Sequence, residues 1–254
     1  WCKTGAADPE WMLRFVWAAT WFWFLSGHLT EGYAWYVEAV TRTAAMGSTL
    51  SRGKALLSAG GLAFTLGKYV EAREHLIQSV AIARAHHDLA LLAPAVAYYG
   101  TVLTGLGEYM AASEASREAL ELARTVRSDW LQAYMLFISG NNIAILQGIE
   151  AARPTFEESL QLARTVGDPW LLSLDMRTMA VVASLSGDSA TAQRLLDEGI
   201  DELRKVGDRW GLAYSLVGLS YECLRSGQPA RAKIHLDESM TLALELASTT
   251  SVAI

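Results

Sequence analysis

Apolar residues recur every three or four positions along most of the chain, and polar residues fill the positions between them. Leu76, Val80 and Ala83 are one example. Apolar residues at this spacing lie on one face of an α-helix. No segment alternates apolar and polar residues strictly, as a half-buried strand would. The pattern therefore predicts a chain of amphipathic helices, each of about 16 residues.

A glycine turn separates pairs of these helices, with a period of about 40 residues. Its glycines are Gly27, Gly67, Gly107, Gly148, Gly187 and Gly227. Because glycine enters the left-handed conformation at little cost, each is predicted to end the first helix of a hairpin. Half a repeat away, Asp129, Asp168 and Asp208 stand where a helix N-cap belongs. The predicted hairpins are residues 9–46, 50–86, 88–126, 128–166, 168–206 and 208–246.

A single hairpin of this kind cannot bury its own apolar face, so neighbouring hairpins must stack. We therefore expect one helical-repeat domain over residues 1–254, in the all-α class, folded as a right-handed α-α superhelix (solenoid) of six hairpins. In the fourth repeat the second helix begins one residue early and carries Pro154 near its start. A local irregularity is predicted there.

Residues 11–25 form the most apolar stretch and are predicted to be a buried helix. Six of the nine tryptophans lie in the first 35 residues: Trp1, Trp11, Trp17, Trp21, Trp23 and Trp35. Tryptophan around most of a helix indicates burial on several sides or an exposed apolar patch. Two interpretations stay open: this end packs against an upstream domain, or it forms a ligand cage. Because the sequence begins at Trp1 and not at methionine, we expect it to be part of a longer protein.

Composition and charge argue against several classes of protein. Apolar residues make up 52% of the chain, so it can bury a large core. The net charge of −6 and the lack of a basic run argue against direct nucleic-acid binding, which requires a positive face. The apolar stretch is shorter than a membrane span and carries Arg14. Cys2 and Cys223 are isolated, which favours a reducing, cytoplasmic location over a disulfide framework.

The sequence shows no set of residues with catalytic or metal-binding spacing. His86 and His87 are adjacent on a helix and point about 100 degrees apart, so they form a poor chelating pair. The Glu157–Glu158 pair recurs at equivalent places in later repeats, which predicts a solvated outer face. We therefore expect no catalytic residue, no cofactor, no bound metal and no enzymatic activity.

The turn motif Gly-x-Tyr-x-x-Ala, with a small residue seven positions earlier (Gly60 before Gly67), resembles the tetratricopeptide repeat, although the period exceeds the usual roughly 34 residues. Repeats of this length resemble the C-terminal arrays of bacterial LuxR-type and maltotriose-activator-like signal-transduction ATPases. Trp21–Val40 is similar to the tryptophan-rich repeat that opens such arrays. The resemblance implies a non-enzymatic sensor or regulatory arm of a bacterial signalling ATPase or transcriptional regulator, with an upstream nucleotide-binding domain in the same chain.

The resemblance also implies that the first helix of each hairpin lines a concave groove. The candidate groove residues are Trp17, Trp21, Phe64, Asn141, Asn142, Arg177, Tyr214 and Tyr221. A mostly apolar and aromatic groove suits a small-molecule effector, or a peptide or protein partner. Arg177 and Asn142 resemble part of a clamp for a peptide carboxylate, and Asn141 is expected either to line the groove or to hydrogen-bond locally.

The sequence alone is compatible with two functions. The chain is either the sensor arm just described or a free-standing scaffold or peptide receptor that binds a partner protein in its concave groove. The tail that begins at Glu245 has no obvious polar capping helix, so self-association through the end repeats is a further expectation.

Overall fold

The computed structural model describes residues 9–251, which contain thirteen α-helices and one 3₁₀ turn. The helices are α1 (Pro9–Ala18), α2 (Thr20–Ser26), α3 (Leu29–Arg42), α4 (Leu50–Thr65), α5 (Tyr69–Ala85), α6 (Leu89–Gly105), α7 (Tyr109–Thr125), α8 (Asp129–Gln147), α9 (Ile149–Val166), α10 (Pro169–Leu185), α11 (Ser189–Val206), α12 (Arg209–Arg225) and α13 (Pro229–Ser251). Trp1 and Cys2 lie outside the described residues. No strand occurs within residues 9–251, so the predicted all-α class is confirmed.

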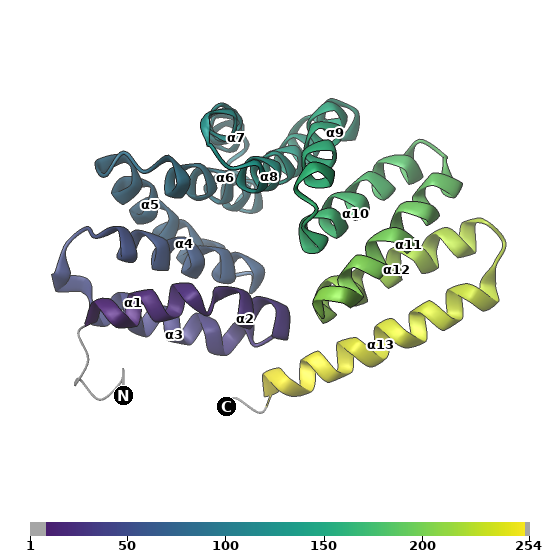
Figure 1. Ribbon diagram of the computed structural model, residues 1–254, viewed down its shortest axis with the longest axis horizontal. Helices are drawn as coiled ribbons and strands as arrows, with labels where there is room; N and C mark the ends of the chain where they lie inside the picture. The colour runs from purple at the N-terminus through teal and green to yellow at the C-terminus, as the bar shows by residue number, and fades with distance from the viewer. Residues whose placement is uncertain (1–8, 252–254) are drawn as a thin grey trace.

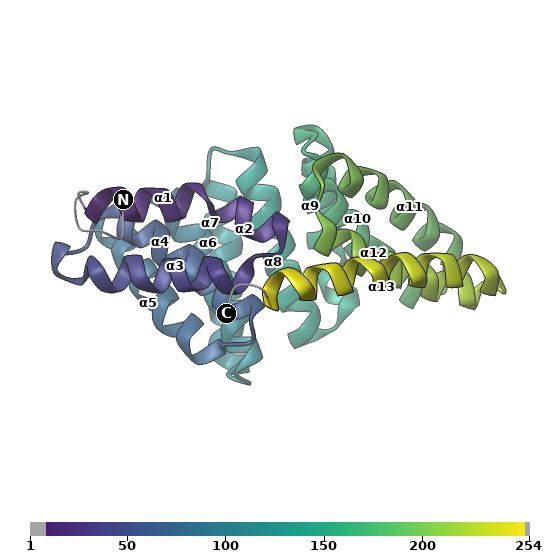
Figure 2. The same cartoon turned by 90° about the horizontal axis from the view of Figure 1, so that it is seen from below.

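The helices form six hairpins that stack side by side. Five hairpins pair α4 with α5, α6 with α7, α8 with α9, α10 with α11 and α12 with α13. In the first hairpin, α1 and α2 together take the place of the first helix and contact α3. The stack curls until α12 contacts α2 and α13 contacts α3, so the array is a nearly closed ring (Figures 1 and 2).

Side-chain oxygens cap the first helices of the repeats. Asp168 and Asp208 each accept a hydrogen bond at 2.8 Å from the backbone amide three residues on, as predicted. In the fourth repeat the cap is Ser128 and not Asp129. Ser128 has an extended backbone, whereas Asp129 is already the first helical residue, and an N-cap residue must be non-helical.

The turns within the hairpins share one geometry except in the fourth repeat. The other five turn glycines have φ between 70° and 84°. Gly148 has φ 97° and ψ 161°, and α9 begins at the next residue. The predicted irregularity of the fourth repeat is confirmed in this turn, while α9 continues through Pro154 without interruption.

The two helices of a hairpin approach closely where the first helix carries a glycine. A Cβ atom on Gly60 would lie 2.6 Å from Leu76, and one on Gly140 would lie 2.5 Å from Phe156. A larger residue at either glycine would therefore separate the helices. One core cluster extends from α1 to α8 and a second from α9 to α13, and smaller clusters around Phe156 and Leu171 join them.

The first helix of the first repeat is interrupted at Ala19, so residues 11–25 do not form the single buried helix that we predicted. At the break, the Thr20 hydroxyl donates a hydrogen bond to the Trp17 carbonyl at 2.7 Å. Only one face of α1 is covered, by α3 and α4. On the opposite side Trp11 is 53% exposed. Within residues 9–251, no helix combines the length and apolar character needed to cross a membrane.

A buried carboxyl group lies in the middle of α10. Asp175 is 1% exposed, and its Oδ1 atom lies 2.9 Å from Oγ of Ser159. Burial raises the pKa of Asp175 to about 7, and the hydrogen bond with Ser159 offsets only part of that effect. A protonated Asp175 can donate to Ser159, whose own hydroxyl then donates to the Ala133 carbonyl at 2.7 Å. The fold therefore favours the protonated carboxyl group.

We predict that Asp175→Asn removes a pH dependence of stability. The unfolded carboxyl group loses its proton near pH 3.8 and the folded one near pH 7, so the free energy of unfolding falls as the pH rises between these values. Such a shift corresponds to about 4 kcal/mol. Urea denaturation should show the variant more stable than the wild type by about 2–4 kcal/mol at pH 8 and similar to it at pH 4.

The control is Asp197→Asn, at an exposed position of α11. This change should leave the free energy of unfolding within about 0.5 kcal/mol at both pH values. Parallel pH profiles for Asp175→Asn and the wild type would contradict the assignment of a protonated Asp175.

Candidate functional site

The first helices of the hairpins surround the inner side of the ring (Figure 1), where two cavities lie next to each other. The first, here called the aromatic cavity, has a volume of about 540 Å³ and is lined by α1, α2, α4, α6, α8 and α10. Its aromatic lining residues are Trp17, Trp21, Phe24, Tyr98, Trp130, Tyr134 and Trp170.

Trp21 joins the first repeat to the fourth and fifth across the aromatic cavity. Its ring centroid lies 4.7 Å from that of Trp170 and 6.0 Å from that of Trp130, both near edge-to-face. Trp130 and Trp170 stack on each other at 6.3 Å. Each such pair contributes about 0.5–1.5 kcal/mol beyond its buried area. Trp21 therefore closes the aromatic cavity on the side of α2.

The aromatic cavity is open where the third repeat lacks a tryptophan that the next three repeats share. Trp130, Trp170 and Trp210 stand two residues after the N-cap of the first helix in successive repeats. In the third repeat this position is Ala90, which is exposed and lines the cavity. Pro94 lies one turn further along the same helix and has no N–H to donate to the Ala90 carbonyl. That carbonyl oxygen therefore lacks its usual helical donor.

Few polar atoms are available in the aromatic cavity. The hydroxyl groups of Tyr98 and Tyr134 hydrogen-bond to each other, and the Thr20 hydroxyl bonds to Tyr36 and Ser58. Burial raises the pKa of Tyr98 and Tyr134, so both phenols stay neutral. None of the described lining residues is charged. The cavity therefore suits a neutral apolar or aromatic group.

The second cavity, here called the arginine cavity, has a volume of about 670 Å³ and lies mainly along α8, α10 and α12. Its polar and charged lining residues are Asn141, Arg177, Thr178, Ser184, Tyr214, Tyr221, Glu222 and Arg225. Tyr134 of the aromatic cavity and Phe137 of the arginine cavity stack on each other on α8, with centroids 6.4 Å apart. The two cavities are therefore neighbours along one helix.

Arg177 is a half-buried cation whose donors are unused. Its Cζ atom lies 5.4 Å from the centre of the Tyr214 ring, and among the described residues it has no hydrogen-bonded or ion-paired partner. Burial lowers the pKa of Arg177, and Asp208 raises it in part. The two Asp208 oxygens already accept hydrogen bonds from the Gly211 amide at 2.8 Å and the Trp170 indole at 3.2 Å.

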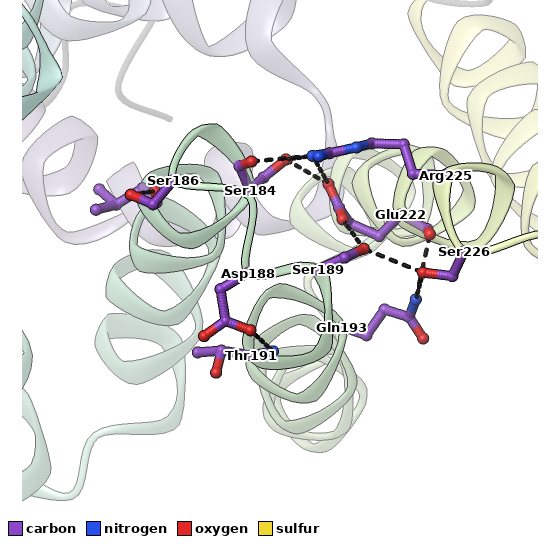
Figure 3. A network of polar contacts seen from close by, with 10 residues as sticks. Ser184, Ser186, Asp188, Ser189, Thr191, Gln193, Glu222, Arg225 and Ser226 are labelled. Carbon is purple, nitrogen blue, oxygen red and sulfur yellow. Dashed lines mark hydrogen bonds and ion pairs between the residues drawn. The ribbon is translucent and has the colours of Figure 1, made fainter.

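Arg225, by contrast, belongs to the polar network shown in Figure 3. Its Nη1 atom donates to the Ser184 carbonyl at 2.9 Å and lies 3.5 Å from the Glu222 carboxylate. Glu222 is 2% exposed and accepts hydrogen bonds from the hydroxyls of Ser184 and Ser189. The network ties the turn between α10 and α11 to the end of α12, so it fixes the fifth repeat against the sixth beside the arginine cavity.

The structure does not bring all of the predicted groove residues together. Trp17 and Trp21 line the aromatic cavity, and Asn141, Arg177, Tyr214 and Tyr221 line the arginine cavity. Phe64 lines neither; it is half-buried and packs against Tyr69, with ring centroids 5.7 Å apart. Asn141 also donates a local hydrogen bond to the Phe137 carbonyl at 2.8 Å.

Asn142 is not in the groove. Its side chain is fully buried, and a Cβ atom on Gly100 of α6 would lie 3.2 Å from its Nδ2 atom. Adjacent helical residues point about 100° apart, so Asn141 faces the cavity while Asn142 faces α6. The predicted pairing of Asn142 with Arg177 is therefore wrong, and the Asn142 amide has no hydrogen-bond partner among the described residues.

The sequence analysis did not identify several cavity residues. Ala90 looks like an ordinary helical residue, and only a comparison with Trp130 one repeat later would have marked its position. Pro94 is an unusual residue inside a helix and was a signal that could have been used. Glu222 and Arg225 stand three residues apart, as exposed helical ion pairs do. Nothing in the sequence shows that Glu222 is buried.

The histidines and paired carboxylates considered in the sequence analysis make structural contacts in the fold. Within residues 9–251, no three His, Cys, Asp or Glu side chains are grouped as they would be around a metal ion. The His86 ring hydrogen-bonds to the Ser48 carbonyl at 2.6 Å. Glu158, one of the paired carboxylates, is exposed and lies 3.7 Å from Arg124 of the preceding hairpin. It therefore contributes to the outer face between repeats.

Comparisons with known proteins show the fold. The family model described as anaphase-promoting complex subunit 5 matches residues 41–105, which is well under half of the chain. No curated protein matches the sequence. The apo form of RapI has a TM-score of 0.69 at 14% identity, over 96% of this chain and 88% of its own.

Two further similar structures contain bound molecules. A Rap protein complexed with competence and sporulation factor has a TM-score of 0.73 at 14% identity, over 96% of this chain and 66% of its own. The Rap conjugation gene regulator of plasmid pLS20, in complex with the Phr* peptide, has a TM-score of 0.69 at 12% identity, over 97% and 66%. The chain is therefore a tetratricopeptide-like helical-repeat protein.

We predict that Glu222→Ala destabilises the fold by about 2–4 kcal/mol, because it leaves a cation and two hydroxyl groups without their buried acceptor. Urea denaturation followed by circular dichroism measures this. Glu238→Ala is the control, because Glu238 makes an exposed ion pair with Arg204 at 3.0 Å and should contribute at most about 1 kcal/mol. Equal losses in the two variants would show that the buried network does not join the fifth and sixth repeats.

Proposed function

We propose that this chain is a non-enzymatic receptor that binds a peptide, or an extended segment of a partner protein, along the inner side of its ring. The observation that carries the proposal is the pair of adjacent cavities, one apolar and one with an unpaired arginine. Apolar surface supplies affinity in such a site, and a few placed polar groups supply specificity.

A peptide fits the two cavities better than a compact small molecule does. The cavities measure about 540 and 670 Å³, and they follow one another along α8. A peptide can place one side chain in each cavity while its backbone runs between them. The similar structures that hold the Phr* peptide and competence and sporulation factor support the proposal through the fold alone.

We further propose that the receptor is the sensor arm of a larger, cytoplasmic signalling protein. The resemblance of residues 11–40 to the opening repeat of regulatory arrays supports this, as does the exposed apolar row of Trp11, Phe15 and Phe22. A reading frame that encodes a nucleotide-binding domain upstream of this segment would agree with the proposal. A reading frame without one would favour the free-standing scaffold.

Self-association through the end repeats is a separate proposal. It rests on Leu236, Met240 and Leu244, which lie four residues apart on α13 and form an exposed apolar row. Sedimentation equilibrium at several concentrations tests it. A monomer at every concentration would exclude a contact through this row.

We predict that Ala90→Trp weakens peptide binding at least about tenfold without lowering stability. Ala90 is exposed, and tryptophan at this position in the next repeat packs well, so the new indole should fill the aromatic cavity. Leu89→Trp is the matched control, because Leu89 is also exposed but does not line the cavity. Peptides are first selected from a random display library on the wild-type chain. Calorimetry then compares the three proteins.

The expected result is a loss of affinity of at least about tenfold in Ala90→Trp and wild-type affinity in Leu89→Trp. The thermal unfolding of both variants checks that they fold. Selected peptides that bind Ala90→Trp as tightly as the wild type would contradict the proposed site.

A further inference from the structure

The arginine cavity holds a guanidinium that no acid of the described residues contacts directly, since Asp208 acts on Arg177 only through longer-range electrostatic attraction. Arg177 is the cation of the cavity without a hydrogen-bonded acid among the described residues. Arg225 lies against Glu222 and Ser184, and the oxygens of Asp208 are occupied by backbone and indole donors. A half-buried guanidinium with unused donors favours a ligand that supplies an anionic oxygen.

The Arg177 guanidinium is oriented so that it can bind a planar anion. The guanidinium lies over the face of Tyr214, with Cζ 5.4 Å from the ring centre, so stacking restrains its orientation. A guanidinium held in this way can form two parallel hydrogen bonds to one carboxylate. The surrounding side chains Val181, Val217 and Phe137 are apolar, so they offer the guanidinium no competing side-chain acceptor.

The charge of the arginine cavity matches a carboxylate better than a phosphate. Arg177 and Arg225 contribute two positive charges, and Glu222 contributes one negative charge to the same lining. The net charge of the lining is therefore that of one cation, and Asp208 outside it adds a further negative charge that acts on Arg177. A phosphate dianion would bring two negative charges close to Glu222 and Asp208, whereas a carboxylate brings only one.

The position of the aromatic cavity adds a second requirement for the ligand, which is an aromatic side chain near the carboxylate. Tyr134 and Phe137, on successive turns of α8, stack on each other across the boundary between the cavities. An aromatic side chain beside Trp130, in the space left by Ala90, would therefore lie near a carboxylate held by Arg177. Such a side chain would extend the stack that Trp130 and Trp170 already form.

We propose that Arg177 recognises a carboxylate of the bound peptide and that the aromatic cavity takes an aromatic side chain next to that carboxylate. This rests on the proposed function and deepens it: the preferred ligand ends in an aromatic residue with a free C-terminus, or carries an acidic residue beside an aromatic one. The carboxylate is the common chemistry, and the experiment separates its two sources.

The test uses four N-acetylated pentapeptides and isothermal titration calorimetry. The first ends in Gly-Ser-Phe with a free carboxylate, and the second has the same sequence with a C-terminal amide. The third carries Glu-Phe within an amidated peptide, and the fourth replaces that Glu by Gln. Each is measured against the wild type, Arg177→Gln, Arg177→Lys and the control Arg164→Gln, which removes an exposed arginine of α9.

The expected result is that at least one carboxylate peptide binds the wild type about tenfold more tightly than its neutral partner. Preference for the first peptide identifies the C-terminus as the source, and preference for the third identifies the acidic side chain. Arg177→Gln should remove the preference, Arg177→Lys should retain part of it, and Arg164→Gln should leave it unchanged.

Equal affinities for acid and amide in the wild type would overturn the inference, and this comparison does not depend on the folding of any variant. A preference that survives in Arg177→Gln would overturn it as well, as would no binding of any of the four peptides at millimolar concentration. The proposed function would still stand in these cases if peptides selected from the library bind the wild type and fail to bind Ala90→Trp.

Discussion

Every hairpin in this chain has an apolar face that it cannot cover by itself, and the rest of the structure depends on that constraint. Stacking neighbours is the only way to bury such a face. The packing of each hairpin on the preceding one sets the angle between successive hairpins. Accumulated over six hairpins, the angle brings α12 and α13 back to α2 and α3. The ring closure then lets Trp21 reach Trp130 and Trp170.

The cavities lie where the repeats differ from one another. Ala90 takes the position that tryptophan takes in later repeats, and its small side chain leaves the aromatic cavity open. Arg177 stands nine residues after its N-cap, where the neighbouring repeats have Phe137 and Val217. An arginine at an otherwise apolar position is costly to bury without a partner. The scaffold is thus periodic, whereas the features proposed to bind the ligand interrupt the period.

The sequence allowed the periodic part to be predicted, because glycine turns and helix caps are local signals. The all-α solenoid, the irregular turn at Gly148 and the caps at Asp168 and Asp208 follow from such signals. Three features could not be predicted from the sequence. No glycine or proline marks the break at Ala19, the burial of Asn142 depends on the direction of α8, and the contacts of Trp21 depend on closure of the ring.

The most direct test of the account is hydrogen exchange, by mass spectrometry, of the chain with and without a peptide selected from a random library. A ligand on the inner side of the ring should slow exchange in α2 and in the first turns of α6, α8 and α10, because binding there suppresses local opening. The outer helices α5 and α7, which line neither cavity, should exchange as before. Protection confined to those outer helices, or to α13, would show that peptides bind elsewhere and would contradict the account.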